Sequence, residues 1–490
     1  MLGRKKKIYV FYIFIMLMPF IITAVHSLFC NQNLFLGKPH NSDEFCYWRV
    51  LYSFSECGFD FASTCGYLNS EAPVGPLGEH GLSTLFAWGG ALLFGKVNEH
   101  TIFLWNLVTL SIALGMFCFI VKPDVVRAFW IIIFIFGNGV LVEQWYSHMM
   151  EVPCLAIILF YCALELEYER NRNKKVFYLA LFVGAFASFM RICYIIILFP
   201  IIIRFAKETK AGKKLYIYLA VYMICFVMIR ITGNLFMKSS VSYLTSIKNG
   251  SLPEKISSLL FNFRKNAGLY LSLNNGSAIE IGQRYFQIIL AVVLIIAAIT
   301  GRNEGDKINP DYLTHAISLI GLIFMIMLLY DVESWRDVRT TMPYSVGVAI
   351  WFVVKSSSGI TQLKSGKLLR IGLLCGTVFS LLIFAPAKYQ ANHPADRFTD
   401  TTVDDSWIKE IPDESEIFCL YKSNLSSNDQ FNLFKNLPPH VGILFARKYE
   451  DIIISQNTIK YILSADEIDA EHFSLMNTSK DYGLLYCSDR

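Results

Sequence analysis

Apolar runs long enough to cross a bilayer recur along the whole chain. A hydrocarbon core about 30 Å thick needs roughly 20 consecutive apolar residues in a helix. Of the 490 residues, 54% are hydrophobic and only 17% are charged. Soluble domains carry about 25% charged residues. The sequence therefore predicts an α-helical polytopic membrane protein and excludes an ordinary soluble one.

Loops rich in Lys and Arg alternate with loops poor in them, and cytoplasmic loops carry the basic excess. We expect about 11 transmembrane helices, with the N-terminus cytoplasmic and the C-terminus outside. They fall near residues 8–28, 101–121, 128–144, 151–167, 176–190, 192–206, 215–236, 285–300, 313–330, 341–354 and 369–386. The stretch 176–206 could instead form two short helices or a broken hairpin. No small-x-small cleavage site follows the first run, so an uncleaved first helix is favoured over a signal peptide.

Composition divides the chain into a transmembrane domain, residues 1–386, and a C-terminal domain, residues 387–490. The first outer loop, residues 29–100, contains a short apolar run at 81–95, which we expect to lie on the outer interface. A second outer segment at 237–284 is polar. About 100 residues suffice for a small core, and the C-terminal domain alternates turns with strand-like runs, which predicts a compact extracytoplasmic α/β domain. These runs are 417–421, 441–445, 451–454, 459–463 and 482–486.

The cysteine pattern and the net charge bear on three questions: metal sites, disulfides and nucleic-acid binding. The 12 cysteines form no zinc signature, and half of them fall in predicted spans, where a thiol behaves as a small apolar group. An oxidising compartment would permit Cys419–Cys487 and one pair among Cys46, Cys57 and Cys65. The net charge of +5 comes from short inter-helix loops, so it does not indicate nucleic acid. We expect no cofactor; a divalent metal is possible but not indicated.

Asp43 and Glu44 are adjacent carboxylates a short distance beyond the first predicted span. Carboxylates at a lipid–water boundary are costly unless something uses them. A carboxylate within hydrogen-bond reach of a hydroxyl can act as a general base. The plain alternative is a solvated acidic pair in a loop. Because of their place early in a long outer loop, we favour Asp43 as base with Glu44 in support.

Two further pairs combine histidine with glutamate. Glu79 and His80 precede the run at 81–95, and His148 and Glu151 flank the turn between two spans. If that turn is helical, His148 and Glu151 lie on one face. Such pairs could orient an acceptor, bind a cation or cap a helix, but two ligands do not make a metal site.

Three arginines are candidates for binding an anion such as a lipid phosphate. Arg191 lies between two apolar runs, where it either snorkels to the interface or pairs with an anion. Arg336 and Arg339 open the span near 341–354 and could bracket a phosphate with charge-assisted bonds. Local acidic residues, Asp331, Glu333 and Asp337, could neutralise them instead.

With these residues placed, the chain resembles the GT-C glycosyltransferase superfamily, polytopic enzymes that use polyprenyl-phosphate sugars. The resemblance rests on the acidic pair in the first outer loop and on three later segments: Gly78-Glu-His-Gly81 through Leu93-Phe-Gly95, Arg191 through Pro200, and Arg336 through Pro343. The usual His-Pro-Pro after the first loop is absent, and the late motif lacks the common Arg-Tyr. In its acidic first loop and outer C-terminal domain, the chain looks most like bacterial serotype-converting O-antigen glucosyltransferases.

The resemblance implies inverting transfer of a sugar, glucosyl in the nearest subtype, from an undecaprenyl-phosphate donor to a periplasmic glycan such as O-antigen or lipopolysaccharide. It implies a multi-pass protein of the bacterial inner membrane, with Asp43 and Glu44 catalytic and the candidate arginines at the donor phosphate. Lipid A and protein glycosyltransferases of the same superfamily stay open, as does an O-antigen polymerase or ligase. A transporter or flippase is less favoured, because few charges fall in mid-span and no repeated halves are visible.

Overall fold

The computed structural model describes most of the helical part of the chain and most of its C-terminal part. The described residues are 2–40, 42–58, 65–67, 81–209, 224, 251–301, 308–329, 338–356, 411–412, 416–422, 425–446, 448–455, 459–468, 472–479 and 483–489. The predicted spans near 215–236 and 369–386 and the candidate residues Glu79, His80 and Arg336 lie outside them.

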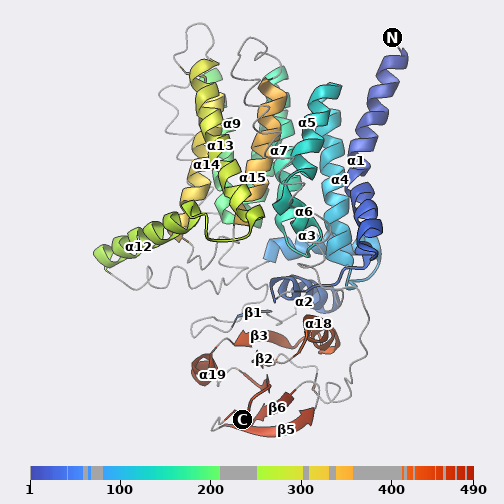
Figure 1. The fold of residues 1–490 in the computed structure, drawn as a ribbon, viewed down its shortest axis with the longest axis vertical. Helices are drawn as coiled ribbons and strands as arrows, with labels where there is room; N and C mark the ends of the chain where they lie inside the picture. Colours follow the sequence, from blue (N-terminus) through green and yellow to red (C-terminus); the bar gives the residue numbers. More distant parts are fainter. Residues whose placement is uncertain are drawn as a thin grey trace.

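Upright helices form a bundle above a small sheet (Figure 1). In the centre of the bundle, α7 packs against α4, α8 and α15, while α1 packs on α4 and α13 packs on α14. The N-terminus lies at the end of the bundle far from the sheet; we call this the far end, and the opposite one the domain end (Figure 1). The bundle helices are α1 (Leu2–Cys30), α4 (Thr101–Val121), α5 (Val125–Phe136), α6 (Gly139–Trp145), α7 (Glu151–Asn171), α8 (Lys174–Met190), α9 (Leu198–Glu208), α13 (Ala278–Thr300), α14 (Pro310–Leu329) and α15 (Val338–Ser356).

Four helices among the described residues are long and apolar enough to cross a membrane, which makes this a multi-pass membrane protein. They are the stretches Ile8–Leu28, Thr101–Val121, Ala278–Thr300 and Pro310–Leu328. The count of about 11 spans is not confirmed. Some predicted spans carry too many charges or are too short; α7, for example, contains Glu151, Glu165 and Glu169.

The predicted span 128–144 is broken, and a second break separates the predicted spans 176–190 and 192–206. Helices α5 and α6 meet at 71°, because Gly137 ends the first helix and Asn138 caps the second by accepting a hydrogen bond from the Leu141 amide. The stretch 176–206 forms α8, a 3₁₀ segment η4 (Ile192–Ile197) and α9. The break is at Arg191, whose extended backbone, φ −144° and ψ 120°, ends α8. The sequence had left open two short helices there, and the structure has them.

Three further helices lie away from the bundle axis at its domain end. Helix α3 (Gly81–Phe94) covers the apolar run of the first loop and packs on α4, α8 and α2. Helix α12 (Leu252–Leu271) begins at a capping box made by Ser251 and Glu254, and it extends sideways from the bundle (Figure 1). Helix α2 (Ser42–Cys57) lies between the bundle and the sheet (Figure 1).

Among the described residues, the sheet has six strands in the order β1-β3-β2-β4-β6-β5. The first four are parallel to one another, β6 runs antiparallel to β4, and β5 runs antiparallel to β6. The outermost strand, β1 (Cys65–Tyr67), comes from the first loop and not from the C-terminal part of the chain. The others are β2 (Ile417–Tyr421), β3 (Gly442–Ala446), β4 (Tyr461–Ser464), β5 (Phe473–Ser479) and β6 (Gly483–Ser488).

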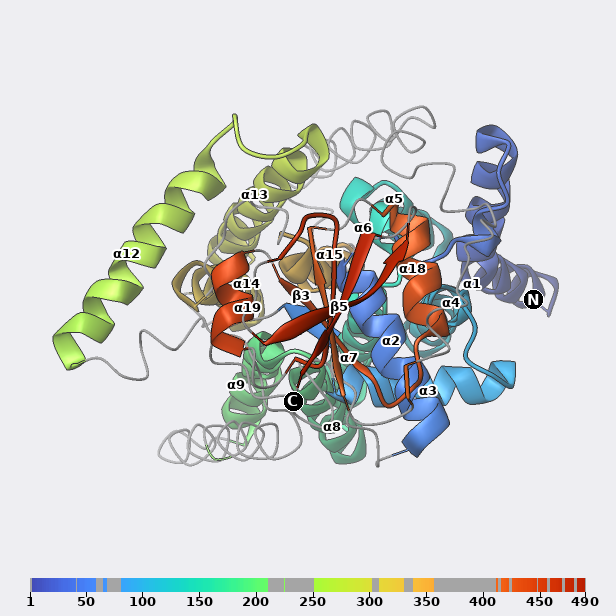
Figure 2. The same ribbon diagram turned by 90° about the horizontal axis from the view of Figure 1, so that it is seen from below.

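Helices cover both faces of this sheet, as the unbroken burial of β2 and β3 requires. On one face lie α2 and α18 (Ser427–Asn436), whose apolar side chains share one core with Phe418 and Ile443. On the other lies α19 (Tyr449–Ser455), which contributes Ile452 (Figure 2). The first loop therefore supplies both a strand and a covering helix to the domain.

One strand prediction for this domain was wrong, and one disulfide that the sequence permitted does not fit the strand order. Residues 451–454 belong to helix α19 and not to a strand. Helix α19 connects β3 to β4, and both of these strands run parallel to β2, which lies between them. Parallel strands need a crossover connection, which is usually a helix. A Cys419–Cys487 disulfide is excluded by the strand order, because β4 separates β2 from β6. Cys419 and Cys487 therefore lie on strands that are two spacings, or about 10 Å, apart. That distance is longer than a disulfide can bridge.

Candidate functional site

Asp43 and Glu44 occupy the first turn of α2, where a helix dipole favours negative charge. Successive residues of a helix project about 100° apart, so the two carboxylates face different surroundings. The Asp43 side chain is 40% exposed, whereas the Glu44 side chain is 2% exposed. Only Asp43 is placed where a substrate could reach it.

Asp43 contacts one bundle residue at the domain end directly and is linked through it to two more. Arg339, near the start of α15, donates from Nη2 to Asp43 Oδ2 at 2.6 Å. Its Nε lies 3.7 Å from Oε1 of Glu151, the first residue of α7. Arg191 donates from Nη2 to the same Glu151 oxygen at 2.7 Å. We call Asp43, Glu151, Arg191 and Arg339 the Asp43 cluster.

The side chains of the Asp43 cluster differ in their exposure to solvent. The Glu151 side chain has no exposed surface, while Arg191 is 18% and Arg339 23% exposed. Two carboxylates and two guanidinium groups leave the cluster formally neutral. The buried Glu151 thus holds two partly exposed arginines, and Asp43 is the most exposed member of the cluster.

Tyr47 lies one turn beyond Asp43 on the same face of α2. Burial raises the pKa of its hydroxyl well above the usual range, while the positive charge of Arg191 opposes that rise and Glu151 adds to it. The hydroxyl therefore stays protonated and can act as a donor beside the cluster. Tyr47 was not among the predicted site residues, although its i+4 spacing from Asp43 would place both on one face of a helix.

Glu44 joins a different contact. Its Oε2 lies 3.2 Å from Nδ1 of His148 and accepts from the His40 amide at 3.2 Å. The other ring nitrogen, Nε2, lies 2.8 Å from the Glu99 carbonyl oxygen, which can only accept, so Nε2 carries a proton. The Nδ1–Glu44 contact then holds a second shared proton. This buried pair fastens the start of α2 to the turn before α7.

His148 and Glu151 therefore do not act together. Helix α7 begins at Glu151, so His148 lies in the turn before it and not one helical turn back on the same face. The His148 ring contacts Glu44, whereas the Glu151 carboxylate contacts Arg191 and Arg339. Within the described part of the chain, no three His, Cys, Asp or Glu side chains gather in a way that could hold a metal ion.

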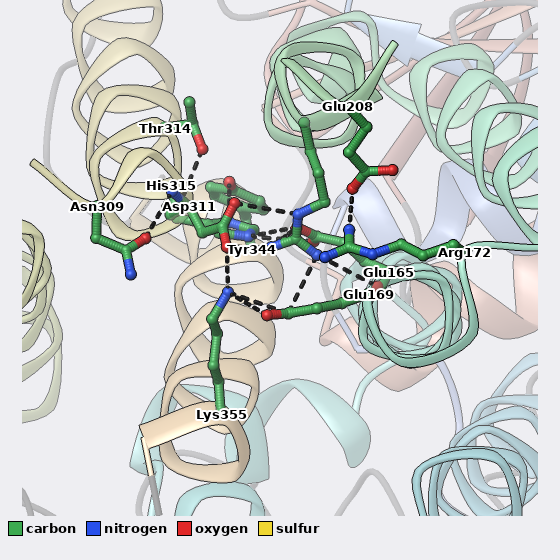
Figure 3. Close-up of polar contacts among 11 residues, drawn as sticks. Glu165, Glu169, Arg172, Glu208, Asn309, Asp311, Thr314, His315, Tyr344 and Lys355 are labelled. Atoms are coloured by element: carbon green, nitrogen blue, oxygen red, sulfur yellow. Dashed lines mark hydrogen bonds and ion pairs between the residues drawn. The ribbon is translucent and has the colours of Figure 1, made fainter. Parts of the chain in front are cut away.

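A second charged cluster, shown in Figure 3, lies where α14 begins and α15 ends, at the far end of the bundle (Figure 1). Arg204 of α9 contacts Asp311 of α14 at 2.8 Å and Glu169 of α7 at 3.1 Å. Lys355 of α15 bonds Glu169 and Asp311. His315 contacts Glu165 at 3.1 Å and the Tyr344 hydroxyl at 3.2 Å. We call Glu165, Glu169, Arg204, Asp311, His315 and Lys355 the Arg204 cluster.

The two clusters share helix α7. Glu151 and Glu165 are fourteen residues apart, which is about 21 Å along a helix. In the Arg204 cluster, each acidic side chain contacts a cationic or imidazole partner, and the network joins α7, α9, α14 and α15. Sequence reasoning missed it, because its members sit at the ends of separate predicted spans.

No family model matches the chain, and no curated protein matches it. Among solved structures, ArnT from Cupriavidus metallidurans in the apo state is similar with a TM-score of 0.45 and 9% identity, over 96% of this chain and 97% of that one. The apo oligosaccharyltransferase from Archaeoglobus fulgidus gives a TM-score of 0.43 and 10% identity, over 94% and 69%. Its complex with Zn and sulfate gives 0.40 and 10%, over 98% and 73%. Likeness at this level does not assign an activity.

Proposed function

We propose that this protein transfers a sugar from a polyprenyl-phosphate donor to a glycan acceptor at the domain end of the bundle. In the finer form of the proposal, undecaprenyl phosphate carries a glucosyl group and the acceptor is O-antigen or lipopolysaccharide. The protein then lies in a bacterial inner membrane, with the far end of the bundle cytoplasmic and the C-terminal domain periplasmic. The convergence of Asp43 with Arg191 and Arg339 on one partly exposed site carries this proposal.

The roles follow from charge and exposure. Guanidinium groups bind phosphate oxygens with paired, charge-assisted bonds. Glu151 holds Arg191 and Arg339 from the buried side, and both arginine side chains remain partly exposed where a donor phosphate could approach them. A carboxylate that is fixed beneath two cations keeps them together before the ligand arrives, and such preorganisation is a large part of catalysis.

Asp43 serves as the general base in this scheme. Its carboxylate takes the proton of an acceptor hydroxyl as the hydroxyl oxygen attacks the anomeric carbon. The bond from that carbon to the phosphate oxygen breaks, and the electron pair leaves with the polyprenyl phosphate. A single displacement inverts the anomeric centre. Arg339 bonds Asp43 in the structure, so donor phosphate competes for Arg339 and frees the Asp43 carboxylate.

The position of the charges argues against a transporter. Transporters bind their cargo near the bilayer midplane between repeated halves. Here the partly exposed charged cluster lies at the helix ends, between α2 and the starts of α7 and α15. A site at this depth suits a lipid headgroup and a water-borne acceptor.

The test is transfer by purified protein in detergent, from radiolabelled undecaprenyl-phosphate glucose to lipopolysaccharide, with Asp43→Asn alongside. General-base catalysis contributes about 10²–10⁴-fold, so the variant should lose transfer by that factor and keep its elution profile. Asp466→Asn is the matched control, since Asp466 is exposed on the domain and contacts only Lys422 among the pairs described. Undiminished transfer by Asp43→Asn would rule out Asp43 as the base. Wild-type inactivity with every polyprenyl-phosphate sugar would overturn the proposal and favour the polymerase or ligase alternative.

A further inference from the structure

Arg49 is a buried cation at the centre of α2, with no exposed surface. Its Nη1 donates to the carbonyl oxygens of Phe434 and Leu437 at 2.8 and 2.9 Å. Its Nη2 donates to the carbonyl oxygen of Val441 at 3.0 Å and to that of Pro438. All four acceptors belong to the end of α18 and the turn that leads into β3.

A planar guanidinium suits this arrangement better than any other side chain. It presents five N–H donors in a fixed fork, and four of the contacts here go to backbone oxygens within one short turn. Buried carbonyl groups are costly to leave without a donor. Arg49 thus fixes the turn 434–441 against α2.

Apolar contacts join the same two pieces. The Phe45 ring lies 5.5 Å from that of Phe434, and the Trp48 ring lies 4.8 Å from that of Phe431, measured between centroids. These side chains share one core with the sheet. Strand β1 adds a third link, since it pairs with β3. Helix α2 is therefore built into the C-terminal domain, although it precedes most of the bundle in sequence.

The Asp43 cluster is consequently divided between two units. Asp43 belongs to α2, whose middle is fixed to the domain through Arg49, whereas Arg191, Arg339 and Glu151 belong to the bundle. The Glu44–His148 contact also fastens the start of α2 to the turn before α7, so α2 links the two units. Asp43 and Arg49 are six residues apart on one helix, about 9 Å along its axis. Any shift of α2 relative to the turn 434–441 changes where Asp43 meets Arg339.

We propose that Arg49 is a positioning residue, through which the C-terminal domain sets the place of Asp43 against the cations of the bundle. This inference rests on the proposed function for its catalytic consequence. In this arrangement the C-terminal domain sets the position of the base, Asp43, while Arg191 and Arg339 of the bundle hold the donor phosphate. Loss of Arg49 should therefore affect the two kinetic constants differently.

The kinetic test compares Arg49→Met and Arg49→Lys with wild type in the transfer assay. Misplacement of a reacting group by about 1 Å costs on the order of 10²-fold in rate. Arg49→Met should lower kcat by that order and leave the donor KM within about twofold. Arg49→Lys keeps the charge without the fork, so its kcat should fall between the two. The control is Lys435→Met, which removes an exposed contact of α18 with Glu99 across the same interface.

Hydrogen exchange measures the positioning without any activity. In Arg49→Met, amides of α2 and of the turn 434–441 should exchange at least tenfold faster, while those of α7 keep their wild-type rates. A rise in donor KM with unchanged kcat, unchanged exchange in α2, or faster exchange throughout α7 would each overturn the inference. If wild-type protein transfers no sugar, the proposed function fails, and the exchange experiment still decides whether Arg49 holds α2.

Discussion

The Asp43 cluster and the Arg204 cluster are built from the same groups, and they differ in exposure. Both join arginines to carboxylates across several helices, and both include a residue of α7. In the Arg204 cluster, the cations Arg204 and Lys355 are 5% and 11% exposed, although Glu169 and Asp311 are 29% and 20% exposed. In the Asp43 cluster, the cations Arg191 and Arg339 are 18% and 23% exposed, and Asp43 is 40% exposed. The second network therefore presents both cations and a carboxylate to water and ligands, whereas the first presents mainly carboxylates.

Exposure of the cations therefore distinguishes a buried ion-pair network from a candidate binding site. A network whose cations are buried can hold helices together but does not present them to a substrate. A network whose cations are partly exposed keeps donors and a carboxylate available, at the cost of weaker internal pairing. Charged residues near span ends do not separate these cases in sequence, since Arg191 and Arg204 look alike there.

Arg204→Met should give the largest change in stability. Removing one partner of a buried ion pair costs about 3–5 kcal/mol, and Arg204 contacts Glu165, Glu169 and Asp311. Thermal unfolding in detergent should show a clear loss, while transfer by the folded protein stays near wild type. Arg127→Met, which breaks an exposed i,i+3 pair with Asp124, should cost less than about 1 kcal/mol. Equal losses in the two variants would mean that the Arg204 cluster adds nothing.

Arg339→Met should have the opposite profile. If Arg339 binds donor phosphate, its loss should lower kcat/KM by about 10²–10³-fold, which is roughly 3–4 kcal/mol of transition-state binding. Stability should change less than in Arg204→Met, because the Arg339 side chain is partly exposed and Arg191 still pairs with the buried Glu151. Steady-state kinetics over a range of donor concentrations would measure this. A variant that unfolds easily but still transfers normally would reverse the comparison between the two clusters.

The Glu44–His148 pair should behave as a structural contact within the site. A double-mutant cycle of Glu44→Gln and His148→Gln should give a coupling energy of about 1–3 kcal/mol in unfolding experiments. Both side chains are almost without exposed surface, and they meet at 3.2 Å. Coupling near zero would show that the second shared proton inferred for this contact has no energetic role.

Tyr47→Phe should give the smallest effect. Losing one neutral donor beside the cluster should lower kcat by roughly tenfold or less, because a typical hydrogen bond contributes about 1 kcal/mol. Above about pH 10 the unfolded state loses the tyrosine proton, whereas burial keeps it on Tyr47 in the folded state. Stability therefore falls as pH rises beyond that point. In Tyr47→Phe this alkaline slope should be shallower, and an unchanged slope would contradict the raised pKa.

Much of the candidate site was predictable from sequence because its members are charged residues at unusual places. Asp43, Glu151, Arg191 and Arg339 were each named from their position beside an apolar run, and the structure brings them together. Their roles in transfer stay a prediction. Arg49 was not named, because its partners are backbone carbonyls 385 to 392 residues away, which no local pattern reveals.

The fold was predictable where apolar pattern decides it and not where pairing does. Strand β2 was predicted with its observed bounds from an unbroken apolar run. Strand β5 was missed, because an edge strand with exposed Leu475 and a polar end at Asn477–Ser479 lacks that signature. Strand β1 is only three residues long, and its partner, β3, is far away in the sequence, so no local pattern predicts their pairing.

The joining of α2 to the turn 434–441 also sets an order for biosynthesis. Asp43 and Arg49 leave the ribosome before most of the bundle, but the carbonyl groups that hold Arg49 come 385 residues later. During synthesis the bundle helices can insert while α2 still lacks its partners. If Arg49 positions Asp43 as proposed, the Asp43 cluster reaches its final geometry late in maturation. A nascent chain that still lacks strands β2 to β6 has its membrane helices but not the carbonyl groups that hold Arg49.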